Sequence, residues 1–184
     1  GPKRGAGRRA GLVSIPVPER MSAVSTLLDH LVALLSPERL EENLFRGQSQ
    51  DLGWGTVYGG QVVGQALCAA LHTVPEDRPV HSLHAYFLRP GDVAAPITYA
   101  VERTRDGSSF ATRHVNAVQH GRPIFTLSAS FQVREAGLEH QAECPPAPPP
   151  ETVHTDQARL APHAARLPEF LRERLLAERP IEIR

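Results

Sequence analysis

One uncharged stretch, from Gly59 to Leu71, constrains the fold of this chain more than any other segment. It contains no proline and no charged residue, and its side chains are mostly Val, Ala and Leu. A run of this length with small residues on all sides predicts a buried helix that lies close against a sheet. Gly59 and Gly60 would let another molecule approach the first turn, where backbone N–H groups are unpaired and the helix dipole is positive.

Two chemical interpretations of this helix start stay open. A thioester or ester carbonyl placed there would be polarised as in an oxyanion hole. Alternatively, the glycines only provide unusual backbone angles where the helix begins. Nucleotide-binding loops do not fit the spacing of Gly59, Gly60 and Gly64, because Gln61 replaces a glycine of the dinucleotide fingerprint and Gln65 replaces the lysine of the phosphate loop.

Alternating apolar and polar residues predict an antiparallel sheet around this helix. The alternation is strict over residues 123–133, and Asp106-Gly107 is a strong hairpin signal. The expected strands cover residues 40–45, 80–88, 97–105, 109–119 and 123–133. We therefore expect an α+β fold, in which a long central helix is wrapped by a curved antiparallel sheet of about five strands.

The composition excludes several classes of function. The 184 residues suit one domain with tails, and 20 basic residues balance 20 acidic ones, so the net charge does not favour nucleic acid or an anionic membrane. No apolar run is long enough to span a bilayer. Cys68 and Cys144 lack the spacing of a zinc site or a disulfide framework, which fits a reducing compartment. Four scattered arginines could include phosphate contacts, but are expected at solvated edge positions: Arg46, Arg89, Arg105 and Arg113.

The chain divides into three segments. Residues 1–20 are rich in Gly, Pro and Arg, and we expect them to be disordered or upstream of the natural start. Met21 is the only methionine and the candidate for that start. Residues 21–139 are expected to form the domain, and residues 140–184 a proline-rich linker and helix.

The two flanks of the domain carry weaker patterns. Leucines at helical spacing predict a helix over residues 25–35, which Ser22 or Ser25 would cap. In the linker, residues 161–178 favour a charged amphipathic helix. From Pro180 onward, the alternation resembles the opening of a strand.

His81 and His84 invite the interpretation of a metal site. On a strand, however, residues three apart face opposite sides, so the two side chains are not expected to bind one ion, and we expect no metal. Either histidine alone could be a site residue that titrates near neutral pH. The alternative is a hydrogen-bonded histidine of the core or rim.

Taken together, several motifs resemble the acyl-CoA thioesterase II (TesB-like) family over about residues 31–140. The matching segments are LFRGQS at 44–49, YGGQVVGQA at 58–66, HSLHAYFLRPGD at 81–92, RDGSSF at 105–110, QHGRPIF at 119–125 and ASFQ at 129–132. The resemblance implies a hotdog fold, in which a sheet wraps a helix. TesB-like enzymes carry two hotdog domains in one chain, so it also implies that these residues are the N-terminal half of a double hotdog.

The resemblance also implies a function and a limited set of site residues. Members of the family hydrolyse fatty acyl-CoA to fatty acid and CoA, so acyl-CoA is the expected substrate, with no cofactor. Their water-activating Asp, Ser or Thr, and Gln lie in the second hotdog domain. His81 matches a histidine implicated in activity and is the candidate catalytic residue. Gly59, Gly60 and Gln61 match the segment that lines the acyl-CoA cleft, although Gln61 would equally serve as a cap of the first helical turn.

The expected partners follow from the same resemblance. Besides acyl-CoA, they are a second hotdog domain, from the same enzyme or another chain, and further copies in a homo-oligomer. The alternative function is a non-catalytic acyl-CoA-binding or assembly module that needs a second hotdog domain. A hotdog dehydratase fits less well, because no acidic residue stands near the helix start. The expected location is the cytoplasm, or the peroxisome in a eukaryote, whose signal would lie outside this chain.

Overall fold

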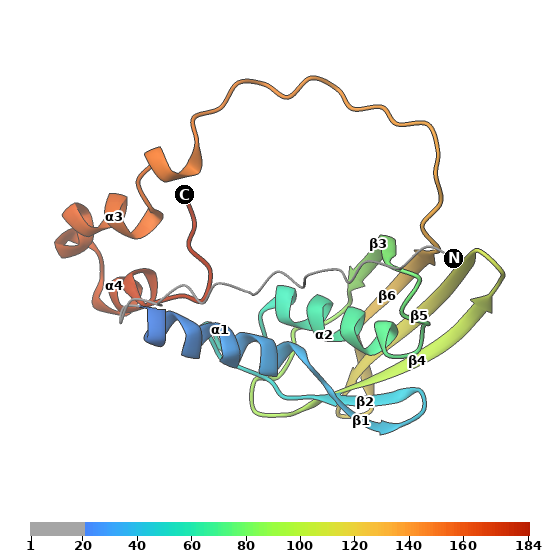
Figure 1. Cartoon of the computed structure of the whole chain (residues 1–184). Helices are drawn as coiled ribbons and strands as arrows, with labels where there is room; N and C mark the ends of the chain where they lie inside the picture. The colour runs from blue at the N-terminus through green and yellow to red at the C-terminus, as the bar shows by residue number, and fades with distance from the viewer. Residues whose placement is uncertain (1–20) are drawn as a thin grey trace, which may run out of the picture.

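The computed structural model describes residues 21–184, and the prediction for residues 1–20 lies outside this range. The described chain forms a curved sheet around a helix, followed by a long connection and a small helical segment (Figure 1). The sheet is antiparallel and has the order β1-β2-β4-β5-β6-β3. Its strands are β1 (Glu38–Glu41), β2 (Leu44–Gly47), β3 (Val80–Phe87), β4 (Ile97–Asp106), β5 (Phe110–Gln119) and β6 (Arg122–Gln132).

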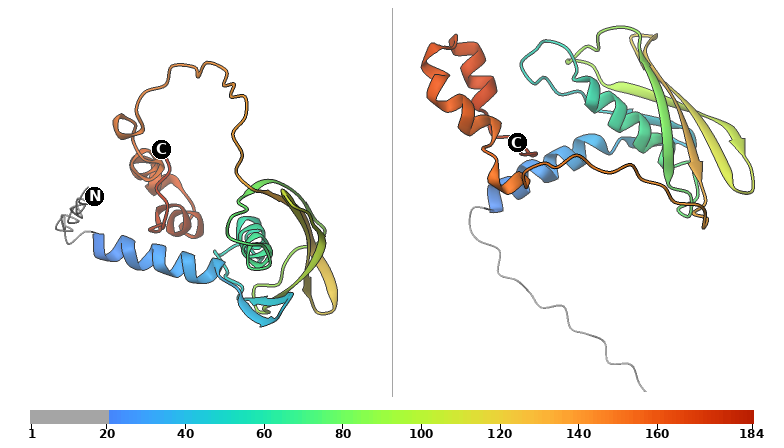
Figure 2. Two further views of the ribbon diagram at one scale, coloured as in Figure 1. Left: turned by 45° about the vertical axis from the view of Figure 1, so that its right-hand side comes forward. Right: turned by 90° about the horizontal axis from the view of Figure 1, so that it is seen from above.

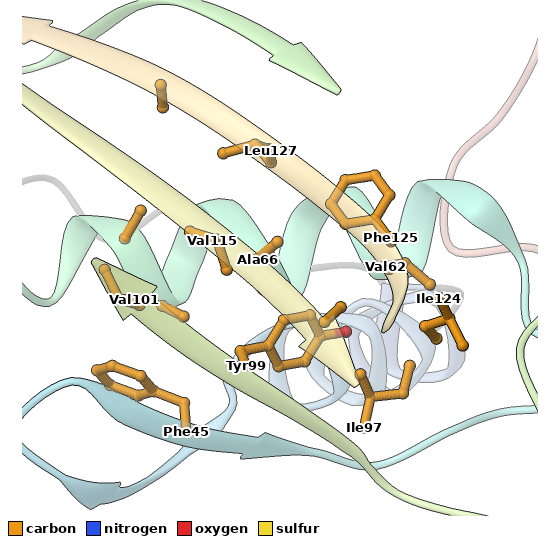
Figure 3. Packing of buried hydrophobic residues seen from close by; sticks show 14 of the residues in the cluster. Phe45, Val62, Ala66, Ile97, Tyr99, Val101, Val115, Ile124, Phe125 and Leu127 are labelled. Atoms are coloured by element: carbon orange, nitrogen blue, oxygen red, sulfur yellow. The ribbon is translucent and has the colours of Figure 1, made fainter. Parts of the chain in front are cut away.

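The central helix α2 (Gly59–Leu71) lies inside the curve of the sheet, as Figure 2 (left) shows with the helix seen end-on. Its buried face is built from small residues such as Ala66 and Ala69, which allow close packing on the strands. Tyr99, Val115 and Phe125 are among the sheet residues that complete this core (Figure 3). The expected α+β fold with a wrapped central helix is therefore confirmed.

The sheet has six strands rather than about five. The segment expected as one strand over 40–45 contributes to two strands, because the chain turns at Glu42 and Asn43 and β1 pairs back onto β2. Asparagine favours such turns because its side chain bonds to nearby backbone and tolerates left-handed angles. The alternation within the segment was too short to reveal the reversal.

The first helix, α1 (Met21–Leu35), begins before both serines that were expected to cap it. Ser22 and Ser25 lie inside the helix, so neither is its N-cap. The predicted end at residue 35 is confirmed, since the helix stops at Leu35, two residues before Pro37.

The C-terminal segment is more broken than the predicted single helix. It contains the short 3₁₀ helices η1 (Pro150–Thr152) and η2 (Ala161–Arg166) and the α-helices α3 (Asp156–Leu160) and α4 (Glu169–Leu176). The fixed backbone angle and missing N–H of Pro162 and Pro168 account for the interruptions. The end of the chain forms no strand, and the carbonyl of Ile183 accepts a hydrogen bond from the N–H of Asp156.

The strand β3 forms one edge of the sheet, because it pairs with β6 and with no other strand of the described chain. Most of its side chains are exposed, including Leu83, Tyr86 and Phe87. Within residues 21–184, no helix is long and apolar enough to cross a membrane.

Candidate functional site

A groove of about 450 Å³ opens where the start of α2 meets the end of β3 and the start of β6. Most of its walls are apolar, which suits a hydrocarbon chain. Arg89 adds a positive charge at the rim. The lining residues are Thr56, Val57, Gly59, Val62, Phe87, Leu88, Arg89, Pro90, Gly91, Ile124 and Phe125.

The first turn of α2 reaches this groove through Gly59. The helix has no side-chain cap, and its first internal hydrogen bonds run from the N–H groups of Gln61 and Val62 to the carbonyl of Tyr58. The N–H groups of Gly59 and Gly60 precede these bonds and are available to a ligand oxygen. A Cβ atom at Gly59 would lie 3.0 Å from the ring of Phe87, so glycine keeps this part of the groove open.

Gln61 lies behind the helix start, and its buried side chain is not part of the groove lining. Its Nε2 donates to the carbonyl of Gln48 (2.7 Å), and its Oε1 accepts from the N–H of Gln50 (3.3 Å). The side chain therefore fixes the loop that precedes α2 and does not cap the first turn of the helix. Gln65, one turn later, donates to the same carbonyl of Gln48 (2.9 Å).

The opposite rim of the groove is held by Gln119, whose side chain is buried at the end of β5. Its Oε1 accepts from the N–H of Asp92, and its Nε2 donates to the carbonyls of Asp92 and Ala95. The N–H of Val57 also donates to the carbonyl of Gly91 (3.0 Å). The bonds of Gln119 join the end of β5 to the loop after β3, and the bond of Val57 joins that loop to the segment before α2, so both rims are held in place.

The loop before the groove is organised by Asp51. One carboxylate oxygen accepts from the N–H groups of Gly53 (2.7 Å), Trp54 (3.0 Å) and Gly55 (3.2 Å). These bonds, with those of Gly53 and Gly55 strongest, lower the pKa of Asp51 below its ordinary value of 3.8, and the charge of Arg174 adds to the effect. Both glycines have positive φ, which the tight loop requires.

Acidification is expected to loosen this loop. Because the folded pKa of Asp51 is depressed, its stabilising contribution is complete above 3.8 and is lost as the pH falls through the lower folded value. Trp54 is the only tryptophan of the chain, so its fluorescence reports on this loop. We expect its emission to change below pH 3.8, and Asp51→Ala to show the altered emission already at neutral pH. Identical emission of the parent at neutral and acid pH, with an intact sheet by circular dichroism, would contradict this prediction.

His81 occupies an irregular position at the start of β3. The strand bulges between Val80 and Ser82, so that His81 is the additional residue. Its Nε2 lies 2.9 Å from the hydroxyl of Ser130, and its ring meets that of Phe110 edge-on at 5.9 Å between centroids. Ser130 belongs to the polar face of β6, so His81 lies on the outer face of the sheet.

His84 shares this outer face, because it pairs with Ser128 of β6. The prediction that His81 and His84 face opposite sides of the strand is therefore wrong. The bulge inserts one residue and reverses the alternation that precedes it. Within residues 21–184, no group of three or more His, Cys, Asp or Glu side chains could hold a metal ion.

The structure brings only part of the predicted site together. Gly59 lies in the groove, Gly60 follows it in the first turn, and Gln61 supports them from behind. His81 lies six residues before Phe87, the groove residue of β3, which corresponds to about 20 Å along an extended strand. Sequence reasoning assigned no role to Gln119 or Asp51, because their partners are backbone groups, which side-chain patterns do not report.

The segment that surrounds the groove matches a known domain family. Residues 49–132 match the acyl-CoA thioesterase N-terminal domain. The match covers 84 of the 184 residues of the chain. The matched residues contain α2 and the strands β3, β4, β5 and β6, and thus every element that lines the groove.

Relatives of this thioesterase domain agree with the match. Acyl-CoA thioesterase 2 of Haemophilus influenzae is 48% identical over 88% of this chain and 56% of that protein. Human acyl-coenzyme A thioesterase 8 is 51% identical over 67% of this chain and 39% of that protein. The crystal structure of the acyl-CoA thioesterase II TesB2 from Mycobacterium marinum superposes with a TM-score of 0.60 and 50% identity, over 66% of this chain and 45% of that one.

The domain therefore has the hotdog fold that the sequence motifs implied, which confirms the resemblance to TesB-like proteins. The chain spans about half the length of these relatives, from 39% to 56%. That coverage agrees with one half of a double hotdog.

Proposed function

We propose that this chain is the N-terminal half of an acyl-CoA thioesterase, which hydrolyses fatty acyl-CoA to a fatty acid and CoA. The observation that carries the proposal is the apolar groove that ends at the uncapped first turn of α2. The match of residues 49–132 to the acyl-CoA thioesterase N-terminal domain supports the same reaction.

In this proposal the acyl chain lies along the apolar wall formed by Val62, Ile124 and Phe125, and the thioester carbonyl lies near Gly59. The oxygen of water attacks the carbonyl carbon, and the negative charge that develops on the carbonyl oxygen is stabilised by N–H groups of the first turn. The carbon–sulfur bond then breaks, and the CoA sulfur takes up a proton. The groups that orient the water would come from the second hotdog domain.

The proposed partners are this second hotdog domain and further copies of the chain in a homo-oligomer. The free edge of β3 and its exposed Leu83, Tyr86 and Phe87 would otherwise promote unspecific association. We propose the cytoplasm as the location, or the peroxisome in a eukaryote.

The proposed reaction is tested by following the release of CoA thiol from a medium- or long-chain acyl-CoA. We expect the chain alone to be inactive but to bind the non-hydrolysable thioether S-dodecyl-CoA, and activity to appear when the second hotdog domain is added. Binding without activity in this reconstituted sample would favour the non-catalytic binding module. His81→Ala belongs in the same assay. His81 lies about 20 Å along the strand from Phe87, the groove residue of β3, which argues against direct contact between His81 and the thioester.

Filling the groove at the helix start is expected to abolish tight binding. In Gly59→Val the added side chain meets the ring of Phe87, where even a Cβ would lie at 3.0 Å. We expect the Kd for S-dodecyl-CoA to rise by at least about tenfold, measured by isothermal titration calorimetry. Gly137→Val is the matched control, because a Cβ at Gly137 meets nothing within 4 Å. Unchanged affinity for S-dodecyl-CoA in a folded Gly59→Val variant would mean that the ligand does not bind in this groove.

A further inference from the structure

The C-terminal segment folds back on itself and lies beside the loop that precedes α2, as Figure 2 (right) shows. Its two ends are joined by the hydrogen bond from Asp156 to Ile183, and the side chain of Gln157 donates to the carbonyl of Ala177. The segment is thus a small folded unit, whereas the sequence suggested a proline-rich linker and a single helix.

Contact between this unit and the domain is made by Arg174 of α4. The guanidinium carbon of Arg174 lies 4.9 Å from the centre of the Trp54 ring and 5.5 Å from that of Phe170. These are distances at which a cation is attracted to an aromatic ring. Beneath the guanidinium the backbone of Gly53 comes so close that a Cβ there would lie 2.7 Å from Arg174 Nε. Arg174 therefore contacts both the side chain of Trp54 and the backbone of Gly53 in this loop.

The contacted loop leads directly into the groove. The carboxylate of Asp51 accepts from the N–H groups of Gly53, Trp54 and Gly55, while Arg174 contacts the Trp54 ring and the backbone of Gly53. The next residues along the chain, Thr56 and Val57, form part of the groove wall. A change in the position of the loop is therefore passed to the wall through a short stretch of backbone.

We propose that Arg174 is a positioning residue, which clamps the loop over residues 51–55 and so sets the wall of the acyl-binding groove. The C-terminal segment thereby takes part in ligand binding without touching the ligand. The clamp itself follows from the contacts of Trp54, while its effect on acyl-CoA rests on the proposed function. Two independent measurements separate these parts.

The clamp is tested through the fluorescence of Trp54, the only tryptophan. In Arg174→Ala we expect emission at longer wavelength, stronger quenching by acrylamide, and faster hydrogen–deuterium exchange in residues 50–57. Arg174→Lys should restore part of the parent behaviour, because an ammonium group also binds an aromatic face. Arg172→Ala is the control, since Arg172 lies on the same helix and pairs with Glu169. If Arg174→Ala matches the parent in both emission and exchange, the clamp does not exist in solution.

The effect on the groove is tested with S-dodecyl-CoA. Loss of an exposed cation–π contact should raise the Kd of Arg174→Ala by about two- to fivefold, while Arg172→Ala keeps the parent value. A change in Trp54 emission with an unchanged Kd would overturn the role of the clamp in binding. Failure of the parent to bind the thioether would contradict both the proposed function and the role of the clamp in binding. The clamp itself would still be tested by fluorescence and hydrogen–deuterium exchange.

Discussion

Replacing Arg113 with methionine is expected to lower the free energy of unfolding by about 3–5 kcal/mol. The Arg113 side chain is 1% exposed, although it carries a full charge in the interior. Its guanidinium donates to the hydroxyl and the carbonyl of Thr73, to the carbonyl of Arg105, and to the carboxylate of Asp106 at 2.6 Å. It thereby joins the end of α2 to the hairpin of β4 and β5.

Methionine has a similar length and would fill most of the space, but it donates no hydrogen bond. The variant therefore leaves the hydroxyl and carbonyl of Thr73 and the carbonyl of Arg105 without these donors, and a buried group left unpaired costs about 1–3 kcal/mol. Asp106 is half exposed, so its carboxylate can turn to water and adds less to the loss. The larger part of the effect is expected from the Thr73 and Arg105 oxygens.

Urea unfolding followed by circular dichroism measures the effect of Arg113→Met. Arg105→Met is the matched control, because Arg105 is exposed on the same hairpin and such surface changes usually stay within about 0.5 kcal/mol. A loss below about 1 kcal/mol in Arg113→Met would show that water replaces the guanidinium contacts, and that this network does not hold the hairpin to α2.

The regular part of this fold could be predicted from the sequence because periodicity is a local signal. The helix over Gly59–Leu71 and the strand pattern after residue 80 are confirmed with boundaries that shift by at most one residue. The expectation that Arg113 lies at a solvated edge is wrong. Arg113 lies with Ala111, Val115 and Ala117 at every second position on the buried face of β5. This spacing could have indicated that its side chain is buried, since a charge on an apolar face needs buried partners.

The candidate site could be predicted only where the signal was carried by residues next to each other. Gly59 and Gly60 mark the helix start, and the groove lies there. The bulge at His81 could not be recognised from the alternating pattern, because a short strand has too few residues to reveal a single inserted one. The contact of Trp54 with Arg174 joins residues 120 positions apart in the sequence, and no local sequence pattern could predict it.

Replacing Gln65 with leucine is expected to destabilise the domain by about 2–4 kcal/mol, and Tyr99→Phe should recover part of this loss. Gln65 is fully buried. Its Nε2 donates to the carbonyls of Leu34 (2.6 Å) and Gln48 (2.9 Å), and its Oε1 accepts from the hydroxyl of Tyr99 (2.7 Å). Gly47 makes room for it, since a Cβ there would lie 2.3 Å from Oε1.

Leucine in place of Gln65 would remove the partner of the Tyr99 hydroxyl and the donor to the Leu34 carbonyl, while the Gln48 carbonyl would keep only the hydrogen bond from Gln61. Burial raises the pKa of Tyr99, so the phenol stays protonated and continues to need an acceptor. Phenylalanine at position 99 removes that need, and the double variant should therefore be more stable than the sum of the single changes predicts. A coupling energy of about 0.5–3 kcal/mol is expected from urea unfolding of the parent, both single variants and the double variant. Strict additivity would contradict the hydrogen bond between Tyr99 and Gln65.

The same substitution is expected to reach the groove. Gln61 and Gln65 both donate to the carbonyl of Gln48, so the loop before α2 is held by two successive turns of the helix. With Gln65→Leu only Gln61 remains, and the loop that ends in the groove wall becomes less restrained. We expect the Kd for S-dodecyl-CoA to rise under conditions where the variant is still folded, whereas Arg113→Met, which acts at the other end of α2, should leave binding unchanged. Equal effects of the two variants on binding would mean that global stability, rather than the glutamine pair, controls the groove.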